Sequence, residues 1–277
     1  MTHPFSLVDV FANAPFTGNP LAVITGAEGL DSAQMQRIAQ WLNLSETTFL
    51  LPPEHKDADY KVRIFTLERE LPFAGHPTLG TCHTWLAAGG KPKGRHIVQE
   101  CGAGLINIKR DAQRLAFAAP PRIRSGPLET EKLDEICTLL NLDRADIVDH
   151  QWLANGPHWA GVLLKSTEAL HAVKPRGDWP KVVDIAMIAP GKGEIDWELR
   201  AIFSTHTGAL IEDPVTGSLN AAAAQWLLES GKATSPYVAA QGICIGRDGR
   251  IYVDQVADGT IWIGGQCMTL FEGQTRF

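Results

Sequence analysis

Short apolar runs bounded by glycine, proline, asparagine or aspartate recur along the whole chain. This pattern is typical of β-strands that end in turns. It predicts strands at residues 5–11, 21–25, 47–51, 61–66, 96–99, 115–118, 159–164, 251–254 and 260–263. A fold rich in short strands is therefore expected.

Two segments between these runs place apolar residues at helical spacing. Residues 32–42 do so behind Asp31 or Ser32, either of which is suited to cap the helix. Residues 129–140 repeat the pattern. Both segments are expected to be amphipathic helices that bury one face.

Two further helices, starting near Pro77 and near Val215, are apolar on nearly all sides, and each follows a turn rich in glycine and proline. A helix that is hydrophobic all round is buried. Because strands flank both helices, we expect each to lie inside a curled sheet. Both end in Trp-Leu followed shortly by Gly, and Trp85 and Trp226 lie about half the chain length apart. This internal repeat predicts two similar domains, joined near residues 119–122.

The charge balance narrows the classes of partner. The 277 residues include 25 Lys and Arg against 31 Asp and Glu, a net charge of −6. Nucleic acids and anionic membranes bind clustered positive charge, so neither is expected as a partner. The one basic stretch, residues 91–95, lies among glycine and proline and is interpreted as a solvated turn. The chain shows neither a signal peptide nor an apolar run long enough to span a membrane, which predicts a cytoplasmic protein.

Several familiar site motifs are missing from the sequence. The five cysteines are scattered without a Cys-x-x-Cys pair, and we expect them to be small, buried apolar side chains. His76 and His83 lack a third zinc ligand in register, and Gly102-Ala103-Gly104 lacks the third glycine of a dinucleotide fingerprint. No phosphate-binding P-loop is present. Bound metal, nucleotide and nicotinamide are therefore not expected.

Three polar clusters interrupt the apolar sequence, at residues 43–49, 70–77 and 211–218. The second and third lie where the two buried helices begin, so we expect their backbone N–H groups to face one shared cleft. Helix N-termini attract anions, which predicts a site for a carboxylate or another small anion. Glu46, in the first cluster, stands between a helix and an apolar strand, where partial burial suits a general base.

Each of these residues also has a purely structural interpretation. Glu46 would satisfy a helix cap or a strand edge. His76 before Pro77 and Asp213 before Pro214 would each cap a helix that has proline at its first position. Ser218 follows Thr-Gly, a common helix start, and the Gly-x-Ser-x-Gly nucleophile elbow is absent. On the pattern alone, both interpretations stay open.

Five stretches follow one another over most of the chain. They are Gly-Asn-Pro-Leu-Ala-Val at 18–23, Asn-Leu-Ser-Glu-Thr-Thr-Phe at 43–49, Glu-Leu-Pro-Phe-Ala-Gly-His-Pro at 70–77, Asn-Gly-Pro at 155–157 and Glu-Asp-Pro-Val-Thr-Gly-Ser at 212–218. Together they resemble the PhzF-like (phenazine biosynthesis isomerase) family, which shares the fold of diaminopimelate epimerase.

The resemblance implies an α+β fold of two similar lobes. Each lobe would be a mixed, mostly antiparallel β-sheet wrapped around a central α-helix, with the active site in the cleft between them. We expect a first lobe of residues 1–118, completed by a strand at 265–277, and a second lobe of residues 119–264. The resemblance also suggests a homodimer.

The same resemblance assigns residues to the site. In the wider epimerase fold, cysteines at the starts of the two central helices exchange protons with the substrate, and Ala74 and Asp213 stand at those positions here. Two-thiol chemistry is therefore not expected. Glu46 matches the family's catalytic glutamate, and His76 and Asp213 match its catalytic histidine and aspartate, which orient the substrate or relay its protons. Four more residues are implied to bind the substrate: Ser45, Gly75, Gly217 and Ser218.

The implied activity is a cofactor-independent isomerase of the trans-2,3-dihydro-3-hydroxyanthranilate isomerase type. Glu46 would move a proton between two carbons on the same face of a small carboxylate that bears an amino or hydroxy group, without metal, flavin or pyridoxal. Two alternatives remain. One is an epimerase or racemase of a small amino or hydroxy acid, which needs a second acid on the opposite face. The other is a non-catalytic module that binds a small molecule on the same fold.

Overall fold

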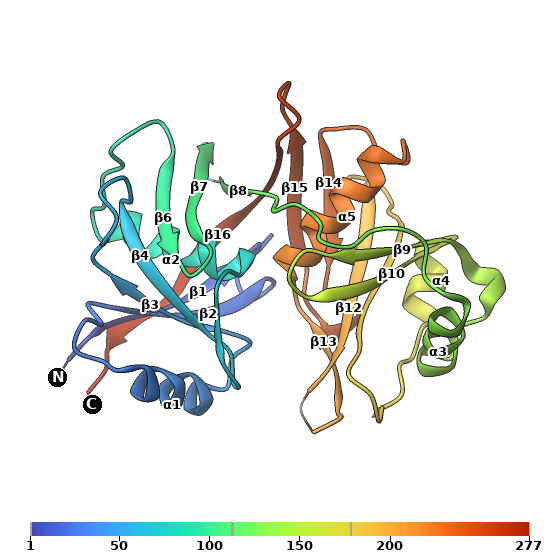
Figure 1. The fold of residues 1–277 in the computed structure, drawn as a ribbon, viewed down its shortest axis with the longest axis horizontal. Coiled ribbons are helices and arrows are strands. Elements are labelled where there is room, and N and C mark those ends of the chain that lie inside the picture. Colours follow the sequence, from blue (N-terminus) through green and yellow to red (C-terminus); the bar gives the residue numbers. More distant parts are fainter. Residues whose placement is uncertain (1, 112–113, 178, 206, 277) are drawn as a thin grey trace. The chain divides into compact units, whose positions relative to one another are not determined.

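The computed structural model describes residues 2–111, 114–177, 179–205 and 207–276 of the chain. It divides into two compact units (Figure 1), the first Met1–Ala118 with Gly264–Phe277 and the second Ala119–Ile263. Both units combine helices with sheet, so the predicted α+β class is confirmed. No helix among the described residues is long and apolar enough to cross a membrane.

The sheet of the first unit closes on itself. In the described residues its strands follow the order β1-β2-β3-β4-β6-β7-β8-β16, and β1 pairs again with β16. The neighbours β2–β3 and β4–β6 are parallel. The strands are β1 (Pro4–Val10), β2 (Asn19–Thr25), β3 (Thr47–Leu51), β4 (Tyr60–Phe65), β6 (Ile97–Cys101), β7 (Gly104–Asp111), β8 (Arg114–Ala118) and β16 (Ile261–Gln274), with the short β5 (Glu70–Leu71) beside β4. The sequence prediction of a wrapped lobe did not include this closed barrel.

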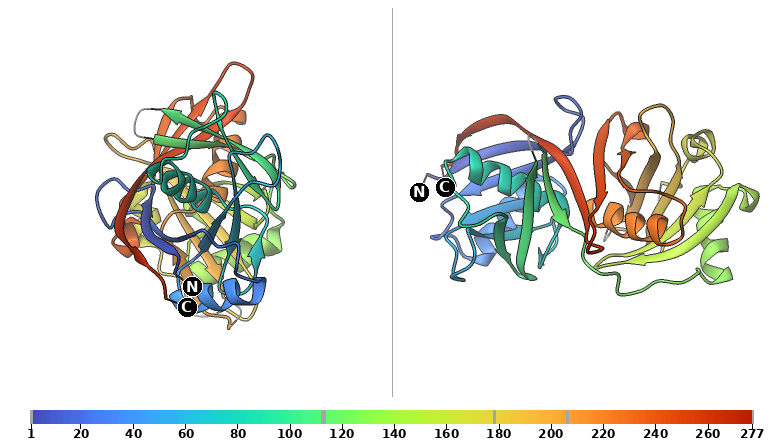
Figure 2. Two further views of the ribbon diagram at one scale, coloured as in Figure 1. Left: turned by 90° about the vertical axis from the view of Figure 1, so that its left-hand side faces the viewer. Right: turned by 90° about the horizontal axis from the view of Figure 1, so that it is seen from above.

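One helix, α2 (Gly75–Ala87), runs through the first unit and contacts β1, β2, β3, β4, β6 and β8. Figure 2 shows it in teal with the strands of this unit around it. Gly80 permits the close approach, because a Cβ there would lie 2.5 Å from Leu21 Cδ2. The all-round apolar pattern of this segment therefore corresponds to burial on all sides.

A second helix of the first unit, α1 (Ser32–Leu42), packs on the outside of the barrel. Its apolar face, with Met35 and Ala39, contacts the core residues Phe49 and Phe65. Asp31 caps the helix in a capping box with Gln34. The predicted bounds and one of the two predicted caps are confirmed.

The second unit is built on a mixed sheet in the order β15-β14-β12-β11-β10-β9, with β13 beside β12 and the start of β16 beside β15. The neighbours β12–β14 and β10–β11 are parallel. The strands are β9 (Ile147–Ala154), β10 (His158–Leu164), β11 (Asp184–Pro190), β12 (Trp197–Ser204), β13 (Leu210–Asp213), β14 (Tyr237–Gln241) and β15 (Gly249–Gln255).

The described residues of the second unit form three α-helices: α3 (Thr130–Leu140), α4 (Thr167–Ala172) and α5 (Gly217–Glu229). The short 3-10 helices η1 (Arg144–Asp146) and η2 (Ile243–Ile245) also lie in this unit. Leucines and isoleucines of α3 share a core with β10 and β11. The run from Ala221 to Ala224 on α5 is buried, and its small side chains let the helix backbone pack closely on its surroundings.

Some expectations were wrong for physical reasons. The pattern missed β7, because Ile108 is its one fully buried residue. It missed α4, which spans only 6 residues and is too short to show a helical period. Cys82 and Cys101 are buried as predicted, whereas Cys244 is exposed.

Candidate functional site

In the first unit, the end of one helix and the start of another bring Glu46 and His76 together. Asn43 ends α1 in the left-handed conformation (φ 54°), and β3 begins at Thr47, so Glu46 directly precedes the strand. His76 is the second residue of α2. Glu46 Oε2 lies 3.6 Å from His76 Nδ1. Two residues about 30 positions apart in the chain thus form one polar pair.

His76 is a neutral imidazole in this setting. Its side chain is 5% exposed, and this burial lowers its pKa from 6.5 to about 3. Near neutral pH the contact with Glu46 is therefore not an ion pair. Its Nε2 is buried and has no hydrogen-bond partner in the described part of the chain. A buried polar atom without a partner destabilises the folded protein by about 1–3 kcal/mol, so a ligand that hydrogen-bonds to Nε2 would be favoured.

Two predicted binding residues flank this pair in sequence. Ser45 is exposed next to Glu46. Gly75 is buried and is the first residue of α2, behind Ala74 as N-cap. Alanine has no side-chain acceptor for the first N–H groups of the helix, so the cap residue leaves these groups open to an anion.

In the second unit, Asp213 is the last residue of β13, and its Oδ2 accepts a hydrogen bond of 2.6 Å from the hydroxyl of Thr216. Thr216 is the N-cap residue of α5. The interpretation of Asp213 and His76 as N-caps is therefore wrong, since Thr216 and Ala74 hold those positions.

Gly217 and Ser218 are the first two residues of α5. The Ser218 hydroxyl accepts a hydrogen bond of 3.3 Å from the Trp159 indole, and its carbonyl accepts one of 2.8 Å from the Asn155 amide. The Asn-Gly-Pro stretch and the start of α5 are therefore joined within this unit. Asn155 Oδ1 is buried and lacks a partner among the described residues.

The neighbouring acidic residue, Glu212, has a different role from Asp213. It forms a two-point ion pair with the Arg200 guanidinium, with both side chains less than one-tenth exposed. Arg200 also donates to the carbonyls of Leu170 and Val173. Adjacent strand residues face opposite sides of a sheet. Glu212 therefore anchors the structure through its buried ion pair, whereas the side chain of Asp213 lies on the opposite face of the strand.

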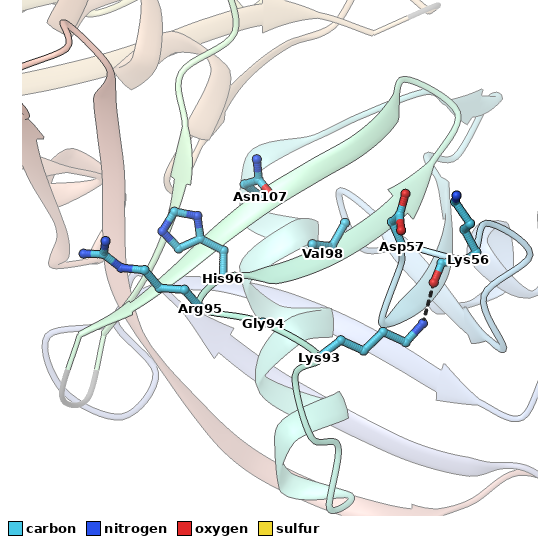
Figure 3. A pocket seen from close by; sticks show the side chains of 8 residues that line it. All are labelled: Lys56, Asp57, Lys93, Gly94, Arg95, His96, Val98 and Asn107. Carbon is cyan, nitrogen blue, oxygen red and sulfur yellow. Dashed lines mark hydrogen bonds between the residues drawn. The ribbon is translucent and has the colours of Figure 1, made fainter.

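A cavity of about 410 Å³ lies elsewhere in the first unit (Figure 3). The residues that line it are Lys56, Asp57, Lys93, Gly94, Arg95, His96, Val98 and Asn107. Lys93 Nζ donates to the carbonyls of Lys56 and Ala58 at 2.9 and 2.6 Å. The predicted site residues do not line this cavity, and its basic loop is exposed, as the interpretation of a solvated turn predicts.

Sequence reasoning missed one residue of these clusters. Gln241, at the end of β14, is fully buried and hydrogen-bonds to Asp213 and Thr216. The sequence feature that could have pointed to Gln241 is a polar residue at the end of an otherwise apolar strand. Among the described residues, no group of three His, Cys, Asp or Glu side chains is placed to hold a metal ion.

Comparison with known sequences gives matches along most of the chain. A family model described as phenazine biosynthesis-like protein (PhzC-PhzF) matches residues 8–273. The trans-2,3-dihydro-3-hydroxyanthranilate isomerase of Pseudomonas fluorescens is 34% identical over 88% of this chain and 87% of its own. Antisense-enhancing sequence 1 of Schizosaccharomyces pombe is 32% identical over 99% of this chain and 98% of its own.

Comparison with solved structures agrees on the fold. A phenazine biosynthesis protein of the PhzF family from Enterococcus faecalis matches with a TM-score of 0.83 and 24% identity, over 100% of both chains. A hydroxyproline epimerase from Agrobacterium vitis matches with a TM-score of 0.58 and 13% identity, over 99% of this chain and 92% of that chain. At these identities the likeness is one of fold.

Proposed function

This chain belongs to the phenazine biosynthesis-like protein family, and from that premise we propose that it is an isomerase that moves a proton between two carbons of a small cyclic carboxylate. The observation that carries the proposal is the Glu46–His76 pair, in which a carboxylate lies 3.6 Å from a buried imidazole. A carboxylate held beside a neutral hydrogen-bonding group is suited to general acid–base work.

The proposed reaction uses Glu46 twice. Its carboxylate takes a proton from an activated carbon, and the C–H electron pair moves into the conjugated double bonds of the substrate. The resulting carboxylic acid then returns the proton to another carbon on the same face, which regenerates the carboxylate. Substrate and product have the same atoms and electrons, so the step needs neither oxidant nor reductant.

His76 would orient the substrate through Nε2, which lacks a partner among the described residues. A neutral imidazole donates one hydrogen bond and accepts one, so it can hold an amino or hydroxy group without adding charge. Ser45 and the N–H groups at Gly75 would contribute further hydrogen bonds. This set of groups fits a substrate that carries both a carboxylate and a second polar group.

The second unit contributes Asp213, Gly217 and Ser218 in this proposal, by the family match at residues 212–218. Because a relative at 34% identity is named trans-2,3-dihydro-3-hydroxyanthranilate isomerase, that compound is the first substrate to test.

An epimerase of a small amino or hydroxy acid is the second candidate, on the strength of the fold shared with the hydroxyproline epimerase. Epimerisation needs an acid on the face opposite the base. His76, whose pKa is lowered to about 3 by burial, would be a neutral imidazole and a weak acid at neutral pH. This observation favours an isomerase with one carboxylate over an epimerase that uses Glu46 and His76.

The test is deuterium uptake from heavy water into trans-2,3-dihydro-3-hydroxyanthranilate and into a panel of small amino and hydroxy carboxylates. We expect mass gain with the wild-type protein and a loss of about a thousandfold in rate with Glu46→Gln, which keeps the shape and removes the base. Glu28→Gln, at an exposed position of the same unit, serves as the matched control.

Three outcomes are informative. Full activity of Glu46→Gln would contradict the proposed base. Exchange with inversion at a single carbon, without an isomeric product, would favour the epimerase. Binding of a compound without hydrogen exchange by the wild-type protein would favour a non-catalytic binding module.

A further inference from the structure

Gln241 is the centre of a buried hydrogen-bond network in the second unit. Its side chain is 0% exposed and makes four hydrogen bonds. Its Oε1 accepts from the Thr216 N–H at 3.1 Å and from the Asn220 amide at 2.8 Å. Its Nε2 donates to the Asp213 carbonyl at 3.1 Å and to the Thr216 hydroxyl at 3.0 Å. All four groups belong to the turn that leads into α5 or to the first turn of that helix.

The direction of this network is fixed by two backbone groups. The Thr216 N–H can only donate and the Asp213 carbonyl can only accept, so the Gln241 amide has one orientation that satisfies both. In that orientation Nε2 donates to the Thr216 oxygen. The hydroxyl has one hydrogen, which must then go to Asp213 Oδ2, 2.6 Å away.

The backbone around this network is packed too closely to move freely. A Cβ on Gly242 would lie 2.6 Å from the Pro214 carbonyl oxygen, and a Cβ on Gly249 would lie 2.3 Å from Val215 Cγ2. The end of β14 and the start of β15 therefore press directly on the turn that carries Asp213. Gly242 also has a φ of +97°, which favours glycine at this position.

The first unit offers an internal comparison. There, Gln99 is also fully buried, and its Nε2 donates to Thr78 at 2.9 Å. Thr78 and Asn220 are the fourth residues of α2 and α5, and each lies 21 positions before its glutamine. Gln99 thus also bridges a strand to the fourth residue of its helix, although it donates to Thr78 whereas Gln241 accepts from Asn220, and its Oε1 accepts a hydrogen bond from the Tyr60 hydroxyl. The bonds from Gln241 to Thr216 and Asp213 are an addition to this shared bridge.

We propose that Gln241 is a positioning residue, which acts through the Thr216 hydroxyl to hold Asp213 as an ionised, oriented carboxylate. A carboxylate that receives a donated hydrogen bond is stabilised in its charged form. Asp213 then serves as an acceptor for an ammonium, amine or hydroxyl group of the substrate, and it is not the acid that donates a proton. The role of Asp213 in turnover rests on the proposed function. The hydrogen bonds among Gln241, Thr216 and Asp213 do not depend on it.

The experiment follows the Asp213 carboxyl carbon by NMR in protein labelled with carbon-13 at the aspartate carboxyl groups. The signal is assigned with Asp213→Asn. We expect Thr216→Val, which removes the donor and keeps the shape, to move the titration midpoint of Asp213 to higher pH. Thr216→Ser, which keeps the hydroxyl, should restore it. Thr78→Val makes the same change at the bridge in the first unit and should leave the Asp213 midpoint unchanged.

Gln241→Glu gives a second, independent variant. The new side chain has the same shape, but an acceptor replaces the donating amide, so the Thr216 hydrogen is drawn away from Asp213. The midpoint should again move to higher pH. On whichever compound shows Glu46-dependent exchange, kcat/KM for Thr216→Val should fall about tenfold or more, because a hydrogen bond to a charged group is lost.

The outcomes separate this inference from the proposed function. An unchanged Asp213 midpoint in Thr216→Val would overturn the positioning role, even if the variant were less stable. A shifted midpoint with unchanged turnover would uphold the network and overturn the role of Asp213 in substrate binding. Loss of turnover in Glu46→Gln together with an unchanged midpoint in Thr216→Val would leave the isomerase intact and reject Gln241 as a positioning residue.

Discussion

The starts of α2 and α5 share a hydrogen bond to a buried glutamine but differ in the polar groups around it. Both helices have 13 residues, and in each the fourth residue is hydrogen-bonded to a buried glutamine on a strand. At the start of α2, burial leaves His76 Nε2 without a partner among the described residues. At the start of α5, the Gln241 amide has each of its polar atoms bonded. Burial therefore leaves an unpartnered imidazole nitrogen at the start of α2, whereas the buried glutamine amide at the start of α5 is fully hydrogen-bonded within the protein.

The difference indicates how an internal repeat can diverge without losing its fold. The core helix and its bridge to the sheet are retained, because their loss would leave polar groups buried without partners. The residues just before each helix vary, because they lie at the helix end, where chemistry can change at little cost to packing. His76, the second residue of α2, and Asp213, which ends the strand before α5, are the two positions that differ in this way.

The largest expected effect comes from the anchor beside Asp213. Arg200→Met should lower the free energy of unfolding by about 3–5 kcal/mol, because Glu212 would be left buried without its cation. Chemical denaturation measures this change. The double variant Arg200→Met with Glu212→Leu removes both charges and should recover most of the loss. A loss below about 1 kcal/mol for Arg200→Met would show that this part of the second unit is not rigidly anchored.

The next effect compares the two glutamines directly. Gln241→Leu should lower the free energy of unfolding by about 3 kcal/mol and Gln99→Leu by about 1–2 kcal/mol, because Gln241 also hydrogen-bonds to two backbone groups of the turn before α5. The two substitutions are matched in chemistry and burial. Equal costs in chemical denaturation would mean that the extra bonds of Gln241 add nothing to the stability of the second unit.

Much of this fold was predictable from local sequence. Asp31 and the apolar spacing of residues 32–42 defined α1, and the all-apolar segments after Pro77 and Val215 pointed to buried helices. Local patterning did not predict the closure of the first sheet, because the β1–β16 pair joins residues at opposite ends of the chain; only the family resemblance implied that a strand at 265–277 completes this unit. Local periodicity carries no information about such pairing.

The candidate site divides in the same way. The family resemblance pointed to Glu46 and His76, and the structure places them 3.6 Å apart. The sequence could not show that His76 Nε2 lacks a partner among the described residues, or that Gln241 forms a buried network. Both depend on contacts between strands and helices that are distant in the chain. Strand β12 also contains two buried charged residues, Arg200 and Glu198, whose exposed fractions are 4% and 5%. Sequence patterning assigns such residues to the surface.

Burial holds His76 neutral beside Glu46. The unfolded chain binds a proton at histidine below about pH 6.5, whereas in the folded protein burial lowers the pKa of His76 to about 3. Stability from this group is therefore fully present above about pH 6.5 and is lost as the pH falls toward 3, by up to about 1.4 kcal/mol per pH unit. The sign follows from the unfolded state binding more protons in that window.

The most direct measurement is a nitrogen-15 NMR titration of the His76 ring between about pH 8 and about pH 4, assigned with His76→Gln. We expect the shifts of a neutral imidazole over the whole range, with one ring nitrogen protonated. A ring that takes up its second proton with a midpoint near 6.5 would contradict it, because Glu46 would then face an imidazolium and the proposed division between the two helix starts would fail.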